Sequence, residues 1–242
     1  MICRVKIVFL VYFAVENSFN MQLQIINTKD GSQTLYIPEM EEQYHSVNGA
    51  TTESKYVYLE KGYLFSKSKN PTVFEVGFGT GLNCLLTAIL AEKHKRPTVY
   101  YSIEKYPLEK NIIQQLKYGE SISTEAQIIF DKIHSCKWNT EVKISQYFSL
   151  IKLQSDLITD DLEEIKNCDV IYFDAFGPDK QPQMWQPEIF RKIYSITATN
   201  GVFVTYSAKG EVRRQLTKSG FEMERIPGPP GKIQMLRGIK KL

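Results

Sequence analysis

Residues 72–83 read TVFEVGFGTGLN, an apolar stretch that runs into three glycines at alternate positions, Gly77, Gly79 and Gly81. Glycine has no Cβ, so at a strand-to-helix turn its backbone can take positive φ and approach a nucleotide-like cofactor closely. A dinucleotide-binding fingerprint needs its third glycine at position 82, which is Leu82. The spacing therefore disfavours a nicotinamide enzyme. It leaves a different nucleoside cofactor, or a turn that binds no ligand.

Four acidic residues stand at or near the ends of predicted strands, where an open parallel sheet binds its ligands. Glu75 precedes the three glycines, and Glu104 lies 23 residues beyond the last of them, a distance that suits hydrogen bonds from both hydroxyls of a ribose. Asp156 is a candidate partner for an adenine amino group, and Asp174 would face the reacting group. Any one of these acids can instead be a surface residue or a helix cap.

A short proline-stiffened loop, DAFGPDKQPQMW, begins at Asp174 directly after a buried-strand pattern. It carries two large aromatic residues, Phe176 and Trp185, and the proline Pro178. Enzymes that methylate amino groups often have a similar loop of Asp or Asn with an aromatic residue at this point. The loop is therefore expected to contact something flat. The alternative is a hydrophobic plug that packs on the sheet, because aromatic side chains are usually buried for their area.

The order of the predicted elements indicates an α/β fold. Strands and helices alternate through most of the chain, which favours a mostly parallel sheet, and the last two strands should pair antiparallel because no helix joins them. Asp30-Gly31 between two alternating apolar runs predicts a small N-terminal hairpin. The expected strands are 72–77, 98–103 and 170–173, with a hairpin at 141–154, and the expected helices are 51–59, 81–94, 108–118, 124–136, 158–166, one that begins at Pro187, and 210–218.

The N-terminal residues differ from the rest of the chain. Residues 7–15 form an apolar run of nine, too short to span a membrane and without the flanks of a signal peptide. A second methionine, Met21, opens the first segment with a structural pattern, so residues 1–20 are predicted to be a non-native start or a dispensable extension. We expect a hairpin and helix lead-in over 21–65 and the main domain over 66–242.

Composition and charge restrict the class of protein only loosely. The net charge of +3 is too small to indicate a nucleic-acid-binding protein by itself, but residues 201–242 carry nine Lys or Arg against three acids. Such a basic end can bind phosphate, or it can be a solvated face. The cysteines form no C-x-x-C pair and no metal-ligand spacing with the histidines, which favours a reduced, cytoplasmic protein without a structural metal.

Five segments carry a resemblance to a known family. The E-x-G-x-G-x-G pattern that begins at Glu75 resembles the first motif of S-adenosylmethionine-dependent methyltransferases. Together the segments resemble the methyltransferases that complete 5-methylaminomethyl-2-thiouridine at the tRNA wobble position, the MnmD type and the methyltransferase half of bifunctional MnmC. The matching segments are YHSVNGATTES (44–54), FEVGFGTGLN (74–83), DAFGPDKQPQMW (174–185), TYSAKGEVRRQL (205–216) and PGPPGKIQMLR (227–237).

The resemblance implies a class I methyltransferase fold, which is Rossmann-like, with S-adenosyl-L-methionine as the methyl donor. The acceptor would be the aminomethyl nitrogen of the modified uridine, with Asp174 as the catalytic residue that orients the amine and stabilises the developing ammonium. The residues expected to bind the cofactor are Glu75, Gly77, Gly79, Gly81, Glu104 and Asp156.

The expected partner is the anticodon loop of tRNA, whose bases are single-stranded and can enter a pocket. We expect no flavin-binding oxidoreductase domain of the kind found in the bifunctional relatives, so a separate enzyme is expected to supply the aminomethyl precursor. Two alternatives remain open: an N-methyltransferase that acts on a small-molecule amine, and a non-catalytic RNA-binding protein that retains a cofactor fold. No membrane or metal partner is expected. The residues expected to contact the RNA are Phe176, Pro178, Trp185, Lys209, Arg213, Arg214 and Lys232.

Overall fold

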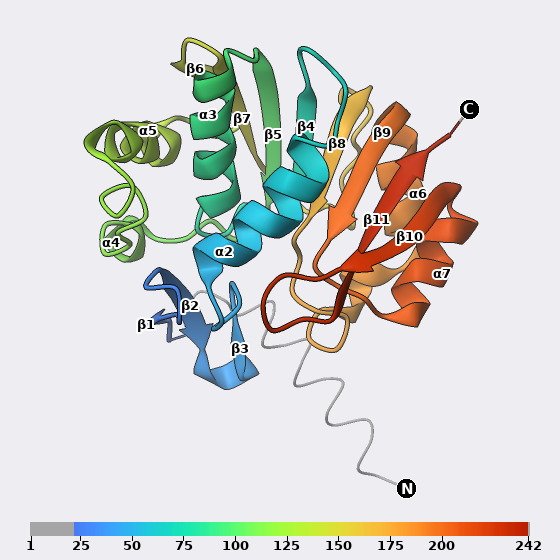
Figure 1. Ribbon diagram of the computed structural model, residues 1–242, viewed down its shortest axis with the longest axis horizontal. Helices are drawn as coiled ribbons and strands as arrows, with labels where there is room; N and C mark the ends of the chain where they lie inside the picture. The colour runs from blue at the N-terminus through green and yellow to red at the C-terminus, as the bar shows by residue number, and fades with distance from the viewer. Residues whose placement is uncertain (1–21, 242) are drawn as a thin grey trace, which may run out of the picture.

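The computed structural model describes residues 22–241, so the predictions about residues 1–20 and Met21 lie outside the described residues. Eight strands in this part of the chain form one sheet in the order β10-β11-β9-β8-β4-β5-β7-β6 (Figure 1). Neighbours among the five central strands run parallel, and both edges end in antiparallel pairs. The strands are β4 (Thr72–Val76), β5 (Thr98–Glu104), β6 (Glu141–Ser145), β7 (Phe148–Gln154), β8 (Cys168–Phe173), β9 (Thr197–Thr205), β10 (Phe221–Pro227) and β11 (Gln234–Lys240).

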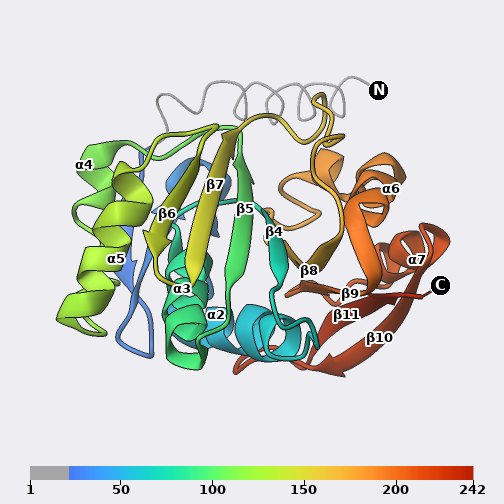
Figure 2. The same cartoon turned by 90° about the horizontal axis from the view of Figure 1, so that it is seen from above.

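The helices lie on both faces of this sheet, so the described chain has three layers (Figure 2). One face is covered by α2, α3 and α5, and the other by α6 and α7. The predicted α/β fold with a mostly parallel sheet and a C-terminal antiparallel hairpin is confirmed. The helices are α2 (Ala50–Ser54), α3 (Leu82–His94), α4 (Lys110–Ile113), α5 (Thr124–Ser135), α6 (Pro187–Ile196) and α7 (Gly210–Lys218), with short 3-10 turns η2 (Pro38–Met40) and η4 (Pro182–Trp185).

Alternation along the central strands produces a core on each face of the sheet. In β4, Val73 packs into the core under α3, whereas Phe74 packs into the core under α6. In β8, Tyr172 and Phe173 divide in the same way, and all four side chains are fully buried. Because successive strand residues point to opposite faces, these near-continuous apolar runs are what a sheet covered on both sides requires.

A smaller sheet of three strands lies at the N-terminal end of the described chain. Its strands are β1 (Gln24–Asn27), β2 (Gln33–Ile37) and β3 (Glu42–Gln43). Strands β1 and β2 pair antiparallel around the turn at Asp30-Gly31, where Gly31 has φ +82°, so the predicted hairpin is confirmed. The following helix is longer than the predicted 51–59, because α2 continues as a π-helical segment, η3 (Lys55–Tyr63).

Two predicted helices differ in the structure. Residues 158–166 form turns, and the prediction near 108–118 retains only the single turn α4. At 158–166 the backbone forms only isolated turn bonds, such as that from the Ile165 N–H to the Leu162 carbonyl. Side chains bind other backbone groups here: the carboxylate of Asp156 accepts from the Ile158 N–H at 2.9 Å, and Lys192 Nζ donates to the carbonyls of Leu157 and Asp160. Such local side-chain bonds compete with helix formation.

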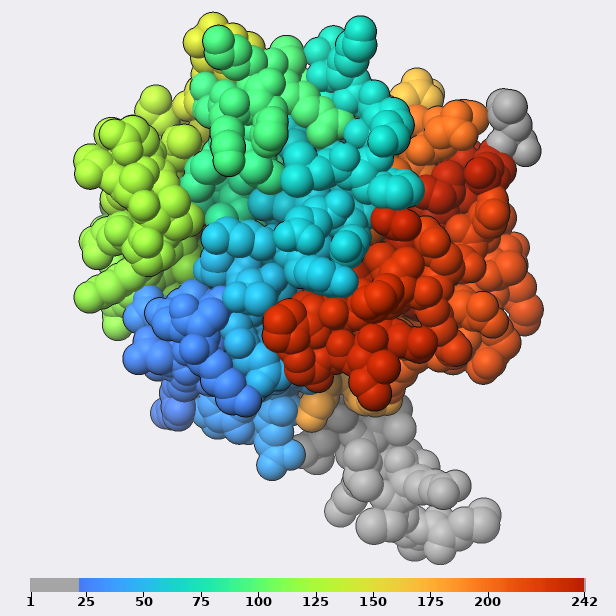
Figure 3. All heavy atoms as spheres, in the orientation of Figure 1, coloured from blue at the N-terminus to red at the C-terminus, as the bar shows by residue number. Residues whose placement is uncertain are grey.

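The C-terminal strands bring the last part of the chain back to the N-terminal part. Strand β11 inserts between β9 and β10, so the loop at 228–233 lies beside α2. Figure 3 shows this contact on the surface, where the red C-terminal segment adjoins the blue segment that contains α2. The Tyr56 hydroxyl donates to the Pro227 carbonyl at 3.1 Å, and Lys232 pairs with Glu53. One wall of the molecule is thus built from residues about 180 positions apart.

Candidate active site

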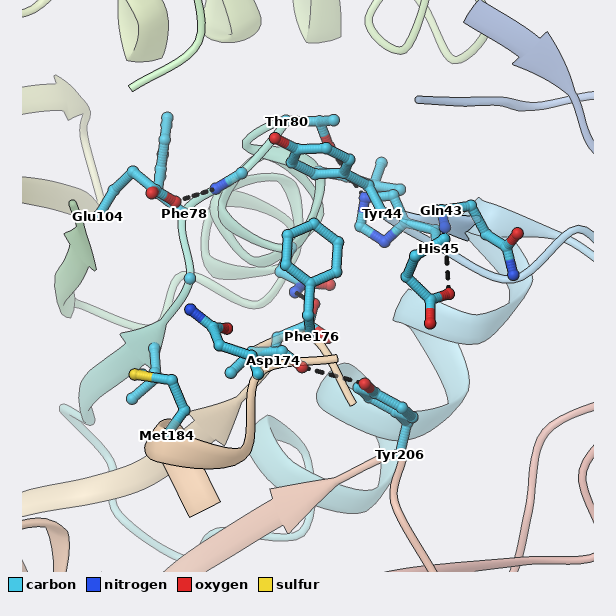
Figure 4. Close-up of a pocket in the computed structure, with 18 of the residues that line it drawn as sticks. Gln43, Tyr44, His45, Phe78, Thr80, Glu104, Asp174, Phe176, Met184 and Tyr206 are labelled. Carbon is cyan, nitrogen blue, oxygen red and sulfur yellow. Dashed lines mark hydrogen bonds between the residues drawn. The ribbon is translucent and has the colours of Figure 1, made fainter. Parts of the chain in front are cut away.

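A cavity of about 410 Å³ lies beyond the carboxyl ends of β4, β5 and β8. Ligands bind in this position in open α/β sheets. Its lining comes from the glycine turn after β4, the ends of β5 and β7, the Asp174 loop after β8, residues 37–48, and the β10–β11 loop. Figure 4 shows Glu104 and Tyr206 at opposite sides of the labelled lining residues, with Phe176 between them. Segments from the whole described chain therefore converge on one site.

The glycine turn forms the floor of this cavity. Gly77 and Gly79 line it, with φ +87° and φ +48°, a backbone region that other residues rarely adopt. A Cβ on Gly77 would lie 2.9 Å from the backbone oxygen of Asp174. The glycine thus allows the turn after β4 to lie directly against the start of the Asp174 loop. Gly81 has φ +73° and precedes α3, but it does not line the cavity.

Glu104 and Asp156 lie in the part of the cavity next to β5 and β7. The Glu104 carboxylate accepts from the backbone N–H groups of Gly79 and Tyr106, at 3.1 and 2.9 Å, and burial raises its pKa. Asp156 forms an ion pair with Lys105 at 3.0 Å and also lines the cavity. The structure therefore brings these two predicted residues together with Gly77 and Gly79.

Asp174 lies on the other side of the glycine turn, in a buried hydrogen-bond network. Tyr58 O–H donates to Asp174 Oδ1 at 2.5 Å, and Asn83 Nδ2 donates to Oδ2 at 2.8 Å. Burial is the main cause that raises the pKa of Asp174 to about 7, and the nearby Glu53 carboxylate also raises it. The hydrogen bond from Tyr58 acts in the opposite direction and lowers this pKa. A carboxyl group with this pKa can accept or release a proton near neutral pH.

The aromatic residues of the Asp174 loop have different positions. Phe176 lines the cavity and meets Tyr44 edge to face, with ring centroids 5.2 Å apart. Trp185 is only 5% exposed and packs on Phe173, and its ring N–H donates to the Phe176 carbonyl at 2.7 Å. A stacking role fits Phe176 but does not fit Trp185, because the indole is enclosed by the core beneath the loop. Pro178 does not line the cavity either.

The predicted phosphate-binding residues do not form one group. Lys232 lines the cavity, where its ammonium lies 2.7 Å from Glu53 and 4.0 Å from the centre of the Tyr206 ring. Lys209 and Arg214 are exposed and pair with Asp179 and Glu211. Arg213 is exposed on α7 and makes no ion pair among residues 22–241. Exposed ion pairs contribute little free energy, so Lys209 and Arg214 can exchange their partners for phosphate at small cost.

Glu75 lies apart from the cavity. Its side chain is fully buried beneath the glycine turn, and Ser102 Oγ donates to Oε2 at 2.6 Å. Burial raises the pKa of Glu75 to about 8. The carboxyl therefore has no direct access to a ligand in the cavity.

Several residues in or next to the cavity were not predicted from the sequence. Glu53, Tyr58 and Asn83 surround Asp174, and Tyr206 donates its hydroxyl to the Ala175 carbonyl at 3.0 Å. His45 is bound to the Thr80 hydroxyl at 2.9 Å, and burial lowers its pKa to about 4, so the ring is neutral at neutral pH. The segment 44–54 was prominent in the sequence, but nothing in its pattern shows that it folds over the glycine turn.

Two further features of the described chain concern ligands and membranes. Among residues 22–241, no group of three or more His, Cys, Asp or Glu side chains is arranged to hold a metal ion. Within the same range, no helix combines the length and the apolar character needed to cross a membrane.

Comparison with known proteins identifies relatives of this chain. It is 31% identical over 217 residues to the tRNA 5-methylaminomethyl-2-thiouridine biosynthesis bifunctional protein MnmC of Pseudoalteromonas atlantica, covering 81% of this chain and 30% of that protein. The MnmC of Burkholderia vietnamiensis is 28% identical over 225 residues, with 85% and 33% covered. The chain thus spans about a third of the length of these relatives.

Solved structures also resemble this chain. The crystal structure of MNMC2 from Aquifex aeolicus superposes with a TM-score of 0.76 at 25% identity, covering 90% of this chain and 70% of that one. Spermidine synthase from Thermotoga maritima, at 13% identity and a TM-score of 0.51, shares the fold alone. The sequence pattern of a family described as S-adenosyl-L-methionine-dependent methyltransferase matches residues 97–241, more than half of the chain. These matches confirm the resemblance found in the five segments, and the chain belongs to this family of S-adenosyl-L-methionine-dependent methyltransferases.

Proposed function

We propose that this chain transfers a methyl group from S-adenosyl-L-methionine to the 5-aminomethyl nitrogen of (2-thio)uridine at the tRNA wobble position, giving 5-methylaminomethyl-2-thiouridine. The observation that carries the proposal is Asp174, whose carboxyl lines the cavity between the glycine turn and Phe176. The names of the MnmC relatives support the choice of product.

The lining residues near β5 and β7 fit the nucleoside part of the cofactor. Glu104 accepts from the backbone N–H groups of Gly79 and Tyr106 and has further acceptor capacity for a ribose diol. Ile103, Leu157 and Ile158 offer apolar contacts for an adenine ring, and Asp156 can accept from its amino group. The open space above Gly77 and Gly79 admits the rest of the cofactor close to the backbone. When bound, the cofactor supplies an electrophilic methyl group on a sulfonium sulfur.

Asp174 would prepare the acceptor amine. A free alkylamine is mostly protonated at neutral pH and then has no lone pair with which to attack. With a pKa near 7, ionised Asp174 can accept one proton from the ammonium and hold the amine by hydrogen bonding. The nitrogen lone pair then forms the new N–C bond as the bond between carbon and sulfur breaks. Fixing nitrogen and methyl at about 3–3.5 Å is the main contribution expected of the site.

The cavity mouth fits a base from a single-stranded loop. Phe176 can stack on a uracil ring that is turned out of an anticodon loop, and base-aromatic stacking contributes about 1–3 kcal/mol. Lys209, Arg213 and Arg214 lie on the adjoining α7 end of the molecule, where they can contact the phosphates of the loop. A separate enzyme would supply the aminomethyl precursor, and the site of action would be the cytoplasm.

The acceptor can be identified directly. The protein would be incubated with methyl-labelled S-adenosyl-L-methionine and tRNA that carries 5-aminomethyl-2-thiouridine, and the nucleosides analysed by mass spectrometry. We expect the label on the aminomethyl nitrogen. The same tRNA with unmodified uridine at the wobble position serves as the control and should gain no label.

Other outcomes separate the alternatives. Label on a free polyamine but not on the tRNA would replace the proposal with a small-molecule N-methyltransferase. Binding of tRNA without any methyl transfer would favour a non-catalytic RNA-binding protein.

A further inference from the structure

Glu75 is a fully buried carboxyl group that the proposed mechanism does not use. It stands in the first motif of the sequence, yet it does not line the cavity and cannot touch a ligand there. Its Oε2 accepts from the Ser102 hydroxyl at 2.6 Å. The amide of Asn83 and the hydroxyl of Tyr100 lie beside the same carboxyl group, where both affect its pKa.

Three oxygen atoms in this region have no hydrogen-bond partner among the described residues. They are Oε1 of Glu75, Oδ1 of Asn83 and the hydroxyl oxygen of Tyr100. Buried polar atoms without partners cost about 1–3 kcal/mol each, so three of them around one carboxyl group call for an explanation. An ionised Glu75 could accept from the Tyr100 hydroxyl, but Oδ1 of Asn83 would still lack a donor.

We propose that Glu75 is a neutral carboxylic acid in the folded protein and acts as a positioning residue, donating its proton from Oε1 to Oδ1 of Asn83. This hydrogen bond fixes which end of the Asn83 amide points away from Glu75. The amide nitrogen is then held toward Asp174 Oδ2, the 2.8 Å contact observed in the structure. The kinetic part of this inference rests on the proposed function, whereas the protonation of Glu75 does not.

The surroundings of Glu75 favour the neutral form. Burial is the largest cause that raises its pKa, and the Asp174 carboxylate raises it further. Hydrogen bonds from Ser102, Asn83 and Tyr100 lower the pKa, but the raising effects outweigh them. The other titratable groups packed around it, from α3, β5 and β8, are Cys84, Tyr100 and Tyr172, and none of these is a cation. A buried carboxylate without a cation would be strongly destabilising, so the group retains its proton instead.

The orientation of Asn83 matters because the two ends of an amide have opposite roles. With nitrogen toward Asp174, the carboxylate accepts from both Asn83 and Tyr58, and both bonds favour its ionised form. With the amide reversed, its oxygen would face Oδ2, and only a protonated Asp174 could bond to it. A reversed Asn83 would thus remove the group that accepts the proton of the amine.

Infrared difference spectroscopy tests the protonation without any substrate. The carbonyl stretch of a buried carboxylic acid is resolved from that of a carboxylate, and Glu75→Gln removes only the Glu75 signal. We expect this acid band in the wild-type protein at neutral pH and its loss in the variant. The absence of such a band in the wild-type protein would overturn the proposal, whatever the substrate of the enzyme.

Two variants test the positioning role by methyl transfer as a function of pH. Glutamine can accept from Ser102 and donate to Asn83, so Glu75→Gln should preserve the turnover number, its pH profile and the affinity for S-adenosyl-L-methionine. Leucine at position 75 cannot donate to Asn83, so in Glu75→Leu the Asn83 amide can reverse and the pKa of Asp174 should rise. The increase of the turnover number with pH should then occur at higher pH. A one-unit rise in the Asp174 pKa corresponds to an about tenfold loss of rate below that pKa.

The controls make each outcome decisive. Thermal unfolding and cofactor binding are measured for both variants, and if Glu75→Leu does not fold, the comparison of Glu75→Gln with the wild-type protein still decides. Loss of cofactor affinity in Glu75→Gln would show an ionised cofactor ligand and contradict the proposal. A changed pH profile in Glu75→Gln with intact folding would contradict it equally.

Discussion

Individual residues at this site have chemical roles that depend on their burial more than on their type. Glu75, Glu104 and Asp174 are all acids at the ends of central strands, but the first is enclosed, the second faces the cavity beside backbone donors, and the third bonds to Tyr58 and Asn83. Their presence at strand ends could be predicted from the sequence. Their separate roles could not, because burial depends on segments that lie far away in the chain.

The residues around Asp174 show this limit most clearly. Tyr58 is 116 positions from Asp174 in the sequence, and Asn83 is 91 positions away. Neither stands at a spacing from Asp174 that sequence periodicity can detect. Trp185, in contrast, belongs to the sequence motif that indicated the acceptor. Its indole is nevertheless buried in the core and donates a hydrogen bond to the Phe176 carbonyl.

A Glu104→Gln substitution tests the cofactor end of the cavity. Glutamine keeps the size of the side chain but loses the charge that can accept from two hydroxyls while also accepting from Gly79 and Tyr106. Hydrogen bonds to charged groups contribute about 1.5–3 kcal/mol, so the dissociation constant for S-adenosyl-L-methionine should rise at least tenfold. Isothermal titration calorimetry measures this. Glu120→Gln, at an exposed position, is the control, and equal affinity in both variants would remove Glu104 from the cofactor site.

At the scale of elements, local sequence predicts best the strands and helices that have a clear boundary residue. The strand at 72–76, the hairpin at 141–154 and the helix that begins at Pro187 lie within a residue or two of their expected positions. Each has a strong period of its own and a turn residue at its boundary. The prediction for 158–166 was wrong because Asp156 and Lys192 bind the backbone that a helix would need.

The π-helical segment η3 is an element that sequence periodicity does not reveal. It continues α2 and carries Tyr58 to the carboxylate of Asp174, while α2 carries Glu53 to Lys232. π-helical turns are rare and are frequently found at functional sites. The same helix thus connects Asp174 to the loop between β10 and β11.

A Gly77→Ala substitution tests the contact between the glycine turn and the Asp174 loop. Gly77 has φ +87°, and a Cβ would meet the Asp174 backbone oxygen at 2.9 Å. Strain of this kind costs about 1–3 kcal/mol, so the melting temperature and the methyl transfer rate should both fall. Differential scanning calorimetry and single-turnover assays give the two values.

Gly177→Ala is the matched control, because its nearest neighbour would be the Tyr206 hydroxyl at 3.6 Å, an ordinary contact. Equal effects of the two substitutions would contradict the special role of Gly77.

At the scale of the whole molecule, the structure shows where the basic residues of the C-terminal part lie. The nine basic residues of the C-terminal part do not act as a uniform patch, since Lys232 is tied to Glu53 and Arg237 to Glu224. Arg213 on α7 remains exposed without an ion pair in the described part of the chain. Composition predicted the basic end, but only the fold separates cavity residues from surface residues.

An Arg213→Ala substitution tests whether α7 contacts RNA. Removal of one phosphate contact should weaken tRNA binding at low salt and reduce the slope of log affinity against log salt by about one unit. Filter binding or fluorescence anisotropy at several salt concentrations measures both. Lys143→Ala, exposed on β6 at the opposite edge of the sheet, should change neither. Identical salt slopes for all three proteins would exclude α7 from the RNA interface.

The pH dependence of single-turnover methyl transfer, in the wild-type protein and in Asp174→Asn, tests the central claim most directly. Burial raises the pKa of Asp174 to about 7. In the proposed mechanism the ionised form accepts the proton of the amine. The wild-type rate should therefore rise as the pH increases through about 7. In Asp174→Asn the rate at neutral pH should fall by about 10²–10⁴, with cofactor affinity unchanged. The rise centred near pH 7 should be replaced by a rise that continues toward the higher pKa of the amine itself. A pH profile that keeps the same shape and height in Asp174→Asn would contradict the account.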